Sequence, residues 1–269
     1  MKEFPKNDTL FNANSLDCMT VRYSASWMNS AQTTIHSDSR TGEILNASIL
    51  INANMISVQY ADRVGATVAI DPRVRTTVFP EDIQGELIEA AIAQAVGTGL
   101  GLTMNWGASC AYPVDSLRSA SFTNTYGTTP CIMDYARFNY VAQPGDKGVR
   151  LTPPDLGVYD CFLVKWNYQP LPQVNDEWEE QAILESWVDE KAGDPRYRYG
   201  RQQIYSRYDP SAIEEDLGDD PMKAGEYGIK NLKYISSINL RISHEVKNCA
   251  DKIFPYITYN KQMYHTLLI

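Results

Sequence analysis

The feature that most constrains the fold of this chain is a helix-like pattern that runs into three closely spaced glycines within residues 94–106. The pattern begins near Pro80, a residue that suits the first turn of a helix. Its apolar residues recur at helical spacing, at Ile83, Leu87, Ile88, Ala91, Ile92, Ala95 and Val96. Three glycines follow at positions 97, 99 and 101, and each costs about 1 kcal/mol relative to alanine inside a helix. We therefore predict a helix that ends at a glycine turn, after which the chain swings back.

This outline resembles the metzincin zinc-peptidase motif, in which two histidines at i and i+4 share one helix face. A glutamate beside the first histidine is the general base, a glycine ends the helix, and a third histidine completes the metal site. In this chain the glycine is Gly101. The first histidine position holds Gln94 and the glutamate position holds Ala95. The second and third histidine positions hold Thr98 and Met104. The chain therefore keeps the helix and glycine of the motif but lacks its three histidines and its glutamate.

Residues 128–138 resemble the Met-turn of the same peptidases, with Met133 as the methionine that lies beneath the metal site. The alternative is that Met133 is a core residue. Tyr135 stands where some metzincins place a tyrosine that reaches the metal or the oxyanion, and a hydrogen bond within the turn is its alternative role. Further stretches resemble bacterial secreted zinc-dependent metalloproteases over about residues 16–235, namely 71–76, 111–118, 140–146, 151–160 and 197–203.

The resemblance implies an α/β (α+β) fold of metzincin type, with a small mixed sheet, a central helix, a Met-turn and a helical C-terminal extension. Pro170 and Pro172 indicate a boundary, so we expect a peptidase-like domain over residues 1–172 and a helical extension packed on it over 173–269. Asp220 is the expected N-cap of a helix that begins at Pro221. The other predicted elements are strands at 19–27 and 43–52, helices at 55–64, 155–167, 175–191 and 221–240, and loops at 29–41 and 107–130.

An edge strand above the active-site helix of metzincins pairs with an extended peptide substrate. Such pairing uses main-chain hydrogen bonds and does not depend on zinc. The resemblance makes the strand from Glu43 to Asn52 the candidate for binding a peptide. The residue pattern alone is equally compatible with an internal core strand.

Zinc, the cofactor of the resembled family, is expected to be lost in this chain. Zinc sites draw on Cys, His and carboxylates, whereas Gln94, Thr98 and Met104 offer two neutral oxygens and a thioether. Such a set suits soft copper(I) better than zinc. The three histidines lie outside the motif, and no two are spaced as a ligand pair; they are His36, His244 and His265.

The acidic and thiol side chains allow two further interpretations. A cluster of six acidic residues between positions 209 and 220 lacks the spacing of a calcium-binding loop, so we interpret it as a solvated surface that also caps a helix. Its members are Asp209, Glu214, Glu215, Asp216, Asp219 and Asp220. The five cysteines contain no C-x-x-C pair, which excludes a zinc ribbon or a thioredoxin-type site. The resemblance brings Cys110 and Cys131 close together, so a disulfide and two buried free thiols stay open as equal alternatives.

Composition excludes some classes of function. The net charge of −9 argues against a nucleic-acid partner, because such a role needs a basic footprint. No run of 18 apolar residues is present, so no transmembrane segment is predicted. Residues 1–8 lack the apolar core of a signal peptide. Proteins of the resembled family are exported, periplasmic or on the cell surface and carry a long upstream region. We therefore interpret the chain as a middle segment or a truncated gene and leave its compartment open.

Together these observations predict a catalytically inactive homologue of a metzincin zinc peptidase that retains peptide or partner binding in the cleft between residues 43–52 and 94–104. Two alternatives stay open at this point. The first is an active metallopeptidase with an unconventional site. The second is a structural domain or the remnant of a truncated gene.

Overall fold

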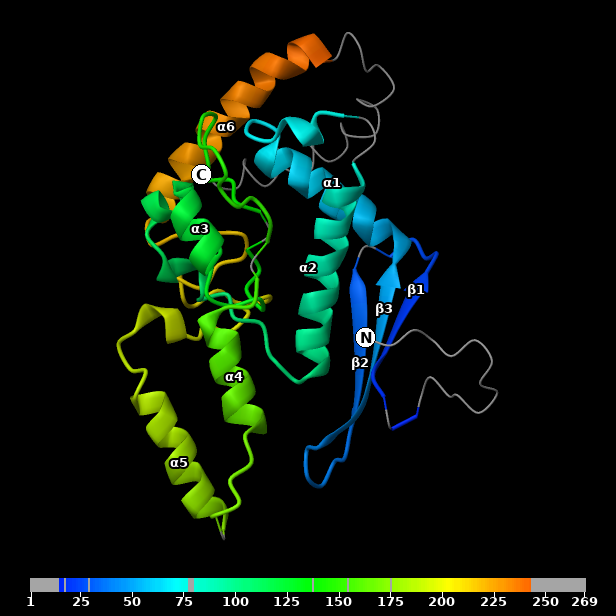
Figure 1. Ribbon diagram of the computed structural model, residues 1–269, viewed down its shortest axis with the longest axis vertical. Helices are drawn as coiled ribbons and strands as arrows, with labels where there is room; N and C mark the ends of the chain where they lie inside the picture. The colour runs from blue at the N-terminus through cyan, green and yellow to red at the C-terminus, as the bar shows by residue number, and fades with distance from the viewer. Residues whose placement is uncertain are drawn as a thin grey trace.

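A computed structural model of the chain describes residues 15–242, apart from positions 17, 29, 77–79, 137, 154 and 175 (Figure 1). The strands are β1 (Thr20–Ser24), β2 (Ala31–Ser37) and β3 (Ile44–Asn52). The helices are α1 (Ala53–Thr67), α2 (Glu81–Gly99), α3 (Ala120–Tyr126), α4 (Val158–Tyr168), α5 (Glu177–Asp189) and α6 (Pro221–Ile242). Short 3-10 turns are η1 (Pro72–Val74), η2 (Ser109–Ala111), η3 (Val114–Arg118) and η4 (Pro195–Tyr197). The fold is α+β with a small sheet, as predicted.

The sheet is mixed, and β3 is its central strand. It pairs with β1 in parallel, starting with Thr20 opposite Ser48, and with β2 in antiparallel orientation, starting with Ala31 opposite Ile51. The strand predicted over residues 43–52 is therefore confirmed, but its interpretation as an edge strand is wrong. The alternative of an internal core strand is the correct one.

The loop predicted over residues 29–41 is also wrong, because Ala31–Ser37 forms β2. Most side chains of this strand are exposed, so no alternation of apolar and polar residues marks it in the sequence. Thr33 and Thr34 are branched at Cβ, which suits a strand. Pairing with the buried β3 decides the structure of a segment whose own pattern is polar.

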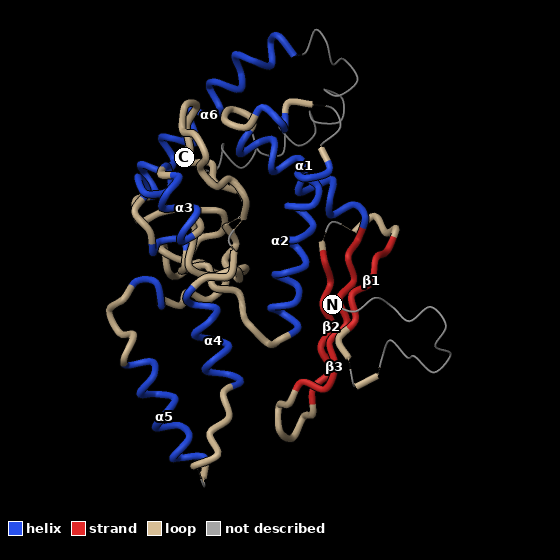
Figure 2. The backbone as a smooth tube through the Cα atoms, viewed as in Figure 1, coloured by secondary structure: helices blue, strands red, loops and turns tan. Residues whose placement is uncertain are grey.

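Helix α2 is the central helix that the sequence predicts, and Figure 2 shows it between the sheet and the loop-rich half of the molecule. Toward the sheet it packs in one apolar cluster, formed by Ile49, Ile51, Met55, Ala91 and Ala95. Its first half packs with the end of α1 in a second cluster, formed by Val68, Val74, Ile83, Leu87 and Phe138. The α2 members of the two clusters follow one another along one row of the helix, with Ile83 and Leu87 in its first half and Ala91 and Ala95 in its second.

A buried cation joins α1 to α2. The side chain of Arg63 is 1% exposed, and its Nη2 lies 3.1 Å from Asp71 and 3.5 Å from Glu86. Its guanidinium carbon lies 5.5 Å from the centre of the Phe138 ring. Removing one partner of a buried ion pair leaves an uncompensated charge, so this contact specifies how the two helices meet.

The C-terminal end of α2 is a Schellman turn with Gly101 in the left-handed region, at φ +79°. Leu102 N–H donates to the Gly97 carbonyl at 3.0 Å, and Gly101 N–H donates to the Thr98 carbonyl at 2.9 Å. The predicted glycine turn is therefore confirmed at Gly101. The two earlier glycines, Gly97 and Gly99, lie inside the helix. Glycine suits both positions because a Cβ at Gly99 would lie 3.0 Å from Met19 and one at Gly97 would meet Met133.

The other predicted helices are confirmed with shifted ends. Helix α6 begins at Pro221, and Asp220 Oδ1 accepts the Lys223 N–H at 3.0 Å, which is the expected cap. The segment over 107–130 holds η2, η3 and α3 rather than loop alone. No helix among the described residues is long and apolar enough to cross a membrane. The division of the chain at residue 172 stays a prediction, and Cys249, His244 and His265 lie outside the described residues.

Replacing a glycine within α2 and the glycine of the turn that follows it by alanine should change the free energy of unfolding in opposite directions. Gly101→Ala forces a Cβ into the left-handed region and should lower the free energy of unfolding by about 1 kcal/mol. Gly85→Ala places a methyl group in open space within α2 and should raise it by up to about 1 kcal/mol. Urea unfolding of the two variants and the parent measures both effects. Equal changes of the same sign would contradict the turn.

Candidate functional site

The structure brings the motif helix against the segment predicted as a Met-turn. We name residues 131–135 the Met133 turn. The amide nitrogen of Gln94 donates to the carbonyl oxygens of Ile132 and Asp134, at 3.5 and 3.4 Å. Met133 is fully buried, and its sulfur lies 2.5 Å from where a Cβ on Gly97 would stand. Glycine at position 97 is therefore what lets α2 rest on the methionine.

The Met133 turn is closed by its own backbone and by the chain that returns from α2. Asp134 N–H donates to the Cys131 carbonyl at 3.2 Å, which closes the turn. Asn105 N–H donates to the Met133 carbonyl at 2.9 Å. Met104, the predicted third ligand position, is half-buried in the apolar cluster that also contains Met133. Gln94 and Met104 thus both contact the part of the chain that holds Met133.

A carboxylate that the sequence analysis missed anchors the turn from behind. Asp160, in the first turn of α4, accepts the N–H groups of Ile132 and Gly157, each at 2.8 Å. The thiol of Cys131 donates to its other oxygen at 3.1 Å. Burial raises the pKa of Asp160, and the three donors oppose that rise. An acidic residue at the third position of a helix is a capping signal, and it marks Asp160 in the sequence.

The two cysteines near the turn are free thiols, so the alternative of a disulfide is wrong. The Cys110 thiol donates to the Ser211 carbonyl at 3.1 Å, whereas Cys131 is directed to Asp160. Burial raises the pKa of both thiols, most strongly that of Cys131. Both groups are therefore held protonated and act as donors.

The returning chain after Met104 is fixed to residues 198–201. The buried Asn105 side chain donates to the Arg198 carbonyl at 3.0 Å and accepts the Gly200 N–H at 2.8 Å. Trp106 N–H donates to the Gly200 carbonyl at 2.8 Å. A Cβ on Gly107 would lie 2.8 Å from the Gly200 nitrogen, so the two backbones touch. This contact holds residues 198–200 directly against the chain that follows the motif helix.

Tyr135, the tyrosine of the predicted site, is the last residue of the Met133 turn, and its ring lies beside Trp106. Tyr135 is half-buried, with its ring centre 6.2 Å from that of Trp106. Its carbonyl accepts the Glu215 N–H at 2.9 Å, which ties the turn to the acidic segment that follows. This backbone contact is part of what holds the Met133 turn in place.

The residues at the motif positions do not fit a zinc ion. The Gln94 amide is directed to backbone carbonyls, and the Thr98 hydroxyl donates to the Gln94 carbonyl at 3.2 Å. Met104 lies in an apolar cluster, and Ala95 is 6% exposed in the cluster against the sheet. Across the part of the chain that the structure describes, no three His, Cys, Asp or Glu side chains are grouped as metal ligands. Zinc requires imidazole, thiolate or carboxylate ligands, and none converges at this point.

The acidic segment is only partly the solvated face that the sequence predicts. Asp220 caps α6, but Asp216 is half-buried and accepts the Ser109 hydroxyl at 2.6 Å. Burial raises the pKa of Asp216 to about 6. Burial and the nearby Asp216 carboxyl raise the pKa of Asp134 well above its ordinary range. Asp134 within the Met133 turn and Asp216 near it are thus two acidic groups with raised pKa values.

A glycine-ended helix over a buried methionine turn, beside a small mixed sheet, defines a fold of the metzincin type. A family model described as Met-zincin matches residues 76–265, which is most of the chain. The chain belongs to the Met-zincin family. The matched range contains every motif position and begins after the sheet and α1. No curated protein and no solved structure matches the chain.

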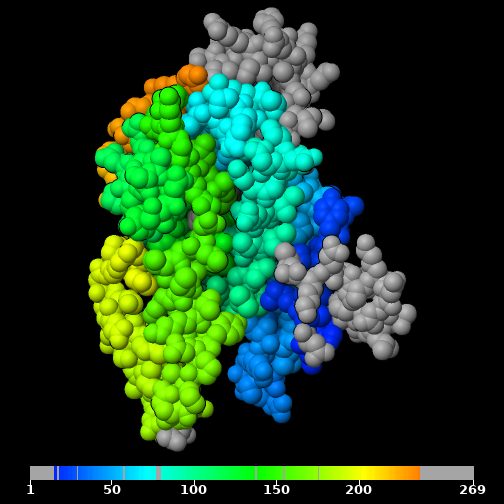
Figure 3. Space-filling model, in the orientation of Figure 1, coloured from blue at the N-terminus to red at the C-terminus, as the bar shows by residue number. Residues whose placement is uncertain are grey.

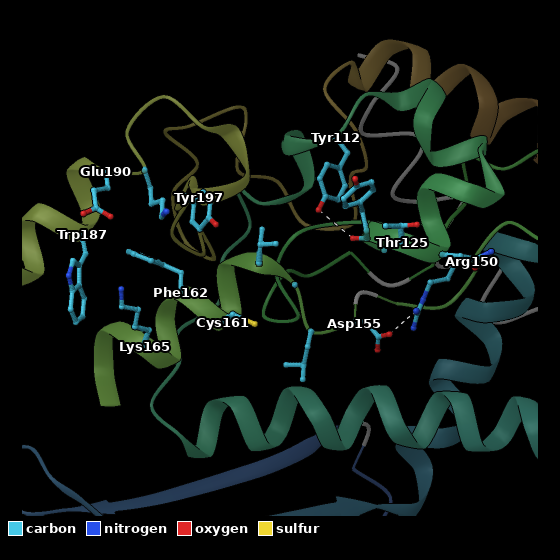
Figure 4. A pocket seen from close by; sticks show the side chains of 17 residues that line it. Tyr112, Thr125, Arg150, Asp155, Cys161, Phe162, Lys165, Trp187, Glu190 and Tyr197 are labelled. Carbon is cyan, nitrogen blue, oxygen red and sulfur yellow. Dashed lines mark hydrogen bonds and ion pairs between the residues drawn. The ribbon is translucent and has the colours of Figure 1, made fainter. Parts of the chain in front are cut away.

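A pocket of about 520 Å³ lies apart from these motif positions (Figure 4). It is bounded by the end of α3, by α4, by α5 and by Tyr197. None of the motif residues lines it. The sequence analysis missed this pocket because its lining residues are spread from position 112 to position 197.

The raised pKa of Asp216 should make stability fall as pH rises. The folded-state pKa of about 6 exceeds the unfolded value of about 3.9, so the folded chain binds the proton more tightly. The contribution is fully present below about pH 4 and is lost as pH rises through about 6, by on the order of 3 kcal/mol. Asp216→Asn keeps an oxygen that can accept from Ser109 and should flatten this fall. Urea unfolding at pH 4 to 7 measures it, with the exposed Asp189→Asn as control; an unchanged slope in Asp216→Asn would refute the assignment.

Proposed function

We propose that this Met-zincin chain is a catalytically inactive homologue that neither holds a catalytic zinc nor hydrolyses peptides. The observation that carries this proposal is the use of Gln94. A zinc peptidase has an imidazole there that faces the metal, whereas the Gln94 amide is bound to the carbonyl oxygens of the Met133 turn. Metal-assisted hydrolysis needs a bound and activated water, and the groups that would activate it are replaced.

The position of the catalytic base supports the same proposal. Ala95 packs against Ile49 and Ile51 of β3, and its carbonyl accepts the Thr33 hydroxyl of β2 at 3.1 Å. A carboxylate introduced among these apolar side chains would be buried without a partner, which is costly. The sheet therefore packs directly against the position at which the motif has its glutamate.

We further propose that the chain retains peptide binding, along β2 instead of β3. Within the described residues β2 pairs on one side alone, so its outer main-chain groups are available for an added strand. Thr33 ties β2 to α2, beside the motif positions. Figure 3 shows a notch between the β2–β3 hairpin and the lobe that holds α4 and α5. An extended peptide in this notch would need no metal to bind.

Zinc content and its restoration test the first proposal. The purified chain should retain no stoichiometric zinc after dialysis and show no chelator-sensitive proteolysis. Gln94→His, Thr98→His and Met104→His together should raise zinc affinity by about tenfold or more over a control pair, Gly85→His with Glu89→His. Adding Ala95→Glu should lower the free energy of unfolding by about 1–3 kcal/mol. One equivalent of tightly held zinc in the parent, together with chelator-sensitive proteolysis, would instead establish an active metallopeptidase with an unconventional site.

Amide hydrogen exchange tests the second proposal. Peptides from a tryptic digest of casein, added in excess, should slow exchange at residues 31–37, because an added strand protects the outer N–H groups of β2. Residues 20–24 at the opposite edge of the sheet are the internal control and should not change. Absence of any slowing, or equal slowing at both edges, would favour a purely structural domain.

A further inference from the structure

The walls of the pocket of about 520 Å³ are rich in aromatic rings (Figure 4). The rings are those of Tyr112, Tyr126, Phe162, Trp187 and Tyr197. Phe162 and Tyr197 meet edge to face, with ring centres 5.6 Å apart. Pockets that hold small organic molecules combine such apolar walls with a few convergent polar groups.

Two lysines supply the polar groups of this pocket. The ammonium of Lys165 lies 4.2 Å from the centre of the Trp187 ring, and that of Lys191 lies 5.3 Å from the centre of the Tyr197 ring. Among the described residues, neither lysine forms an ion pair with a carboxylate. Asp194 acts on Lys191 electrostatically but is already bound by Arg196 at 2.6 Å. Each ammonium therefore has an aromatic face for a partner and keeps its N–H donors for another group.

The remaining charges of the pocket leave it positive. Arg150 is neutralised by Asp155, at 2.7 Å. Against the two lysines stands one other lining acid, Glu190. A locally positive pocket is notable on a chain whose net charge is −9. Such a local excess of positive charge attracts anions.

We propose that this pocket binds a flat aromatic carboxylate. The ring of the ligand would stack among Phe162, Trp187 and Tyr197, and its carboxylate would lie between the ammonium groups of Lys165 and Lys191. Both lysine stems are flexible, so an ammonium can turn from an aromatic face to an anion. Lys191 and Tyr197 also line a neighbouring hollow of about 380 Å³, which leaves room for a substituent on the ring. This site is independent of the peptide-binding notch, since it shares no residue with β2 or the motif positions.

The thiol of Cys161 offers a way to detect a ligand in the pocket. Its thiol lies on α4 at the pocket wall and is exposed, whereas Cys131 is buried and Cys18 and Cys110 are half-buried. Figure 4 shows Cys161 one helical turn before Lys165 on the same helix. A ligand in the pocket should therefore shield this thiol from alkylation.

Calorimetric titration of the full chain with 2-naphthoate tests the proposal, with 2-naphthylmethanol as the neutral analogue. We expect the carboxylate to bind and the alcohol to bind at least about tenfold more weakly, because it lacks the charge that the lysines recognise. Lys165→Gln and Lys191→Gln should each weaken naphthoate binding several-fold, and the exposed Lys233→Gln should not. Equal affinity for the acid and the alcohol, or no effect of either lysine variant, overturns the proposal.

Alkylation of Cys161 provides a second measurement that needs no variant. Iodoacetamide labelling, read by peptide mass mapping, should slow at Cys161 when naphthoate is present and stay unchanged at Cys18 and Cys110. Binding of naphthoate without protection of Cys161 would place the ligand elsewhere and reject the pocket as its site.

Discussion

The carboxylate of Asp160 is the contact on which the arrangement of the site depends. It receives two backbone N–H groups and a thiol, and these fix the Met133 turn to the start of α4. The turn then presents Met133 to Gly97, and Gln94 reaches back to the turn's carbonyl oxygens. Three elements distant in the sequence are thereby joined by hydrogen bonds and packing. None of these contacts requires a metal ion.

Because these contacts need no metal, the fold of this chain can form without one. Catalytic zinc is bound by a scaffold that is already formed, whereas the metal of a zinc finger supplies the folding free energy itself. In this chain the scaffold consists of the apolar clusters on α2, the Arg63 ion pair and the Asn105 contacts with residues 198–200. At position 94, where the metzincin motif has a histidine, this chain has an amide whose donors are used by the Met133 turn. The stability of the fold therefore does not depend on the chemistry of the motif positions.

Local signals in the sequence predicted the parts of the fold that depend on local chemistry. Glycine tolerates the left-handed region, so the turn at Gly101 could be predicted, and Asp220 before a proline marked the start of α6. Strand β2 could not be predicted, because its polar side chains acquire structure only by pairing with β3. The capping position of Asp160 was visible in the sequence, but its contacts with Ile132 and Cys131 were hidden, since only the tertiary fold brings those groups to it. The motif positions were placed together because the resemblance supplied a long-range frame.

The packing of Ala95 makes the order in which motif residues could be introduced matter. Position 95 now faces the apolar side of the sheet, and Thr33 of β2 is bonded to its carbonyl. A glutamate introduced at position 95 would be destabilising on its own, and with no histidine at positions 94, 98 and 104 it would have no catalytic use. Histidines at positions 94, 98 and 104 would have to come first, and the neighbours of Ala95 would have to become smaller or more polar. Each further apolar substitution around Ala95 would lengthen that path, so a glutamate at this position becomes steadily harder to accommodate.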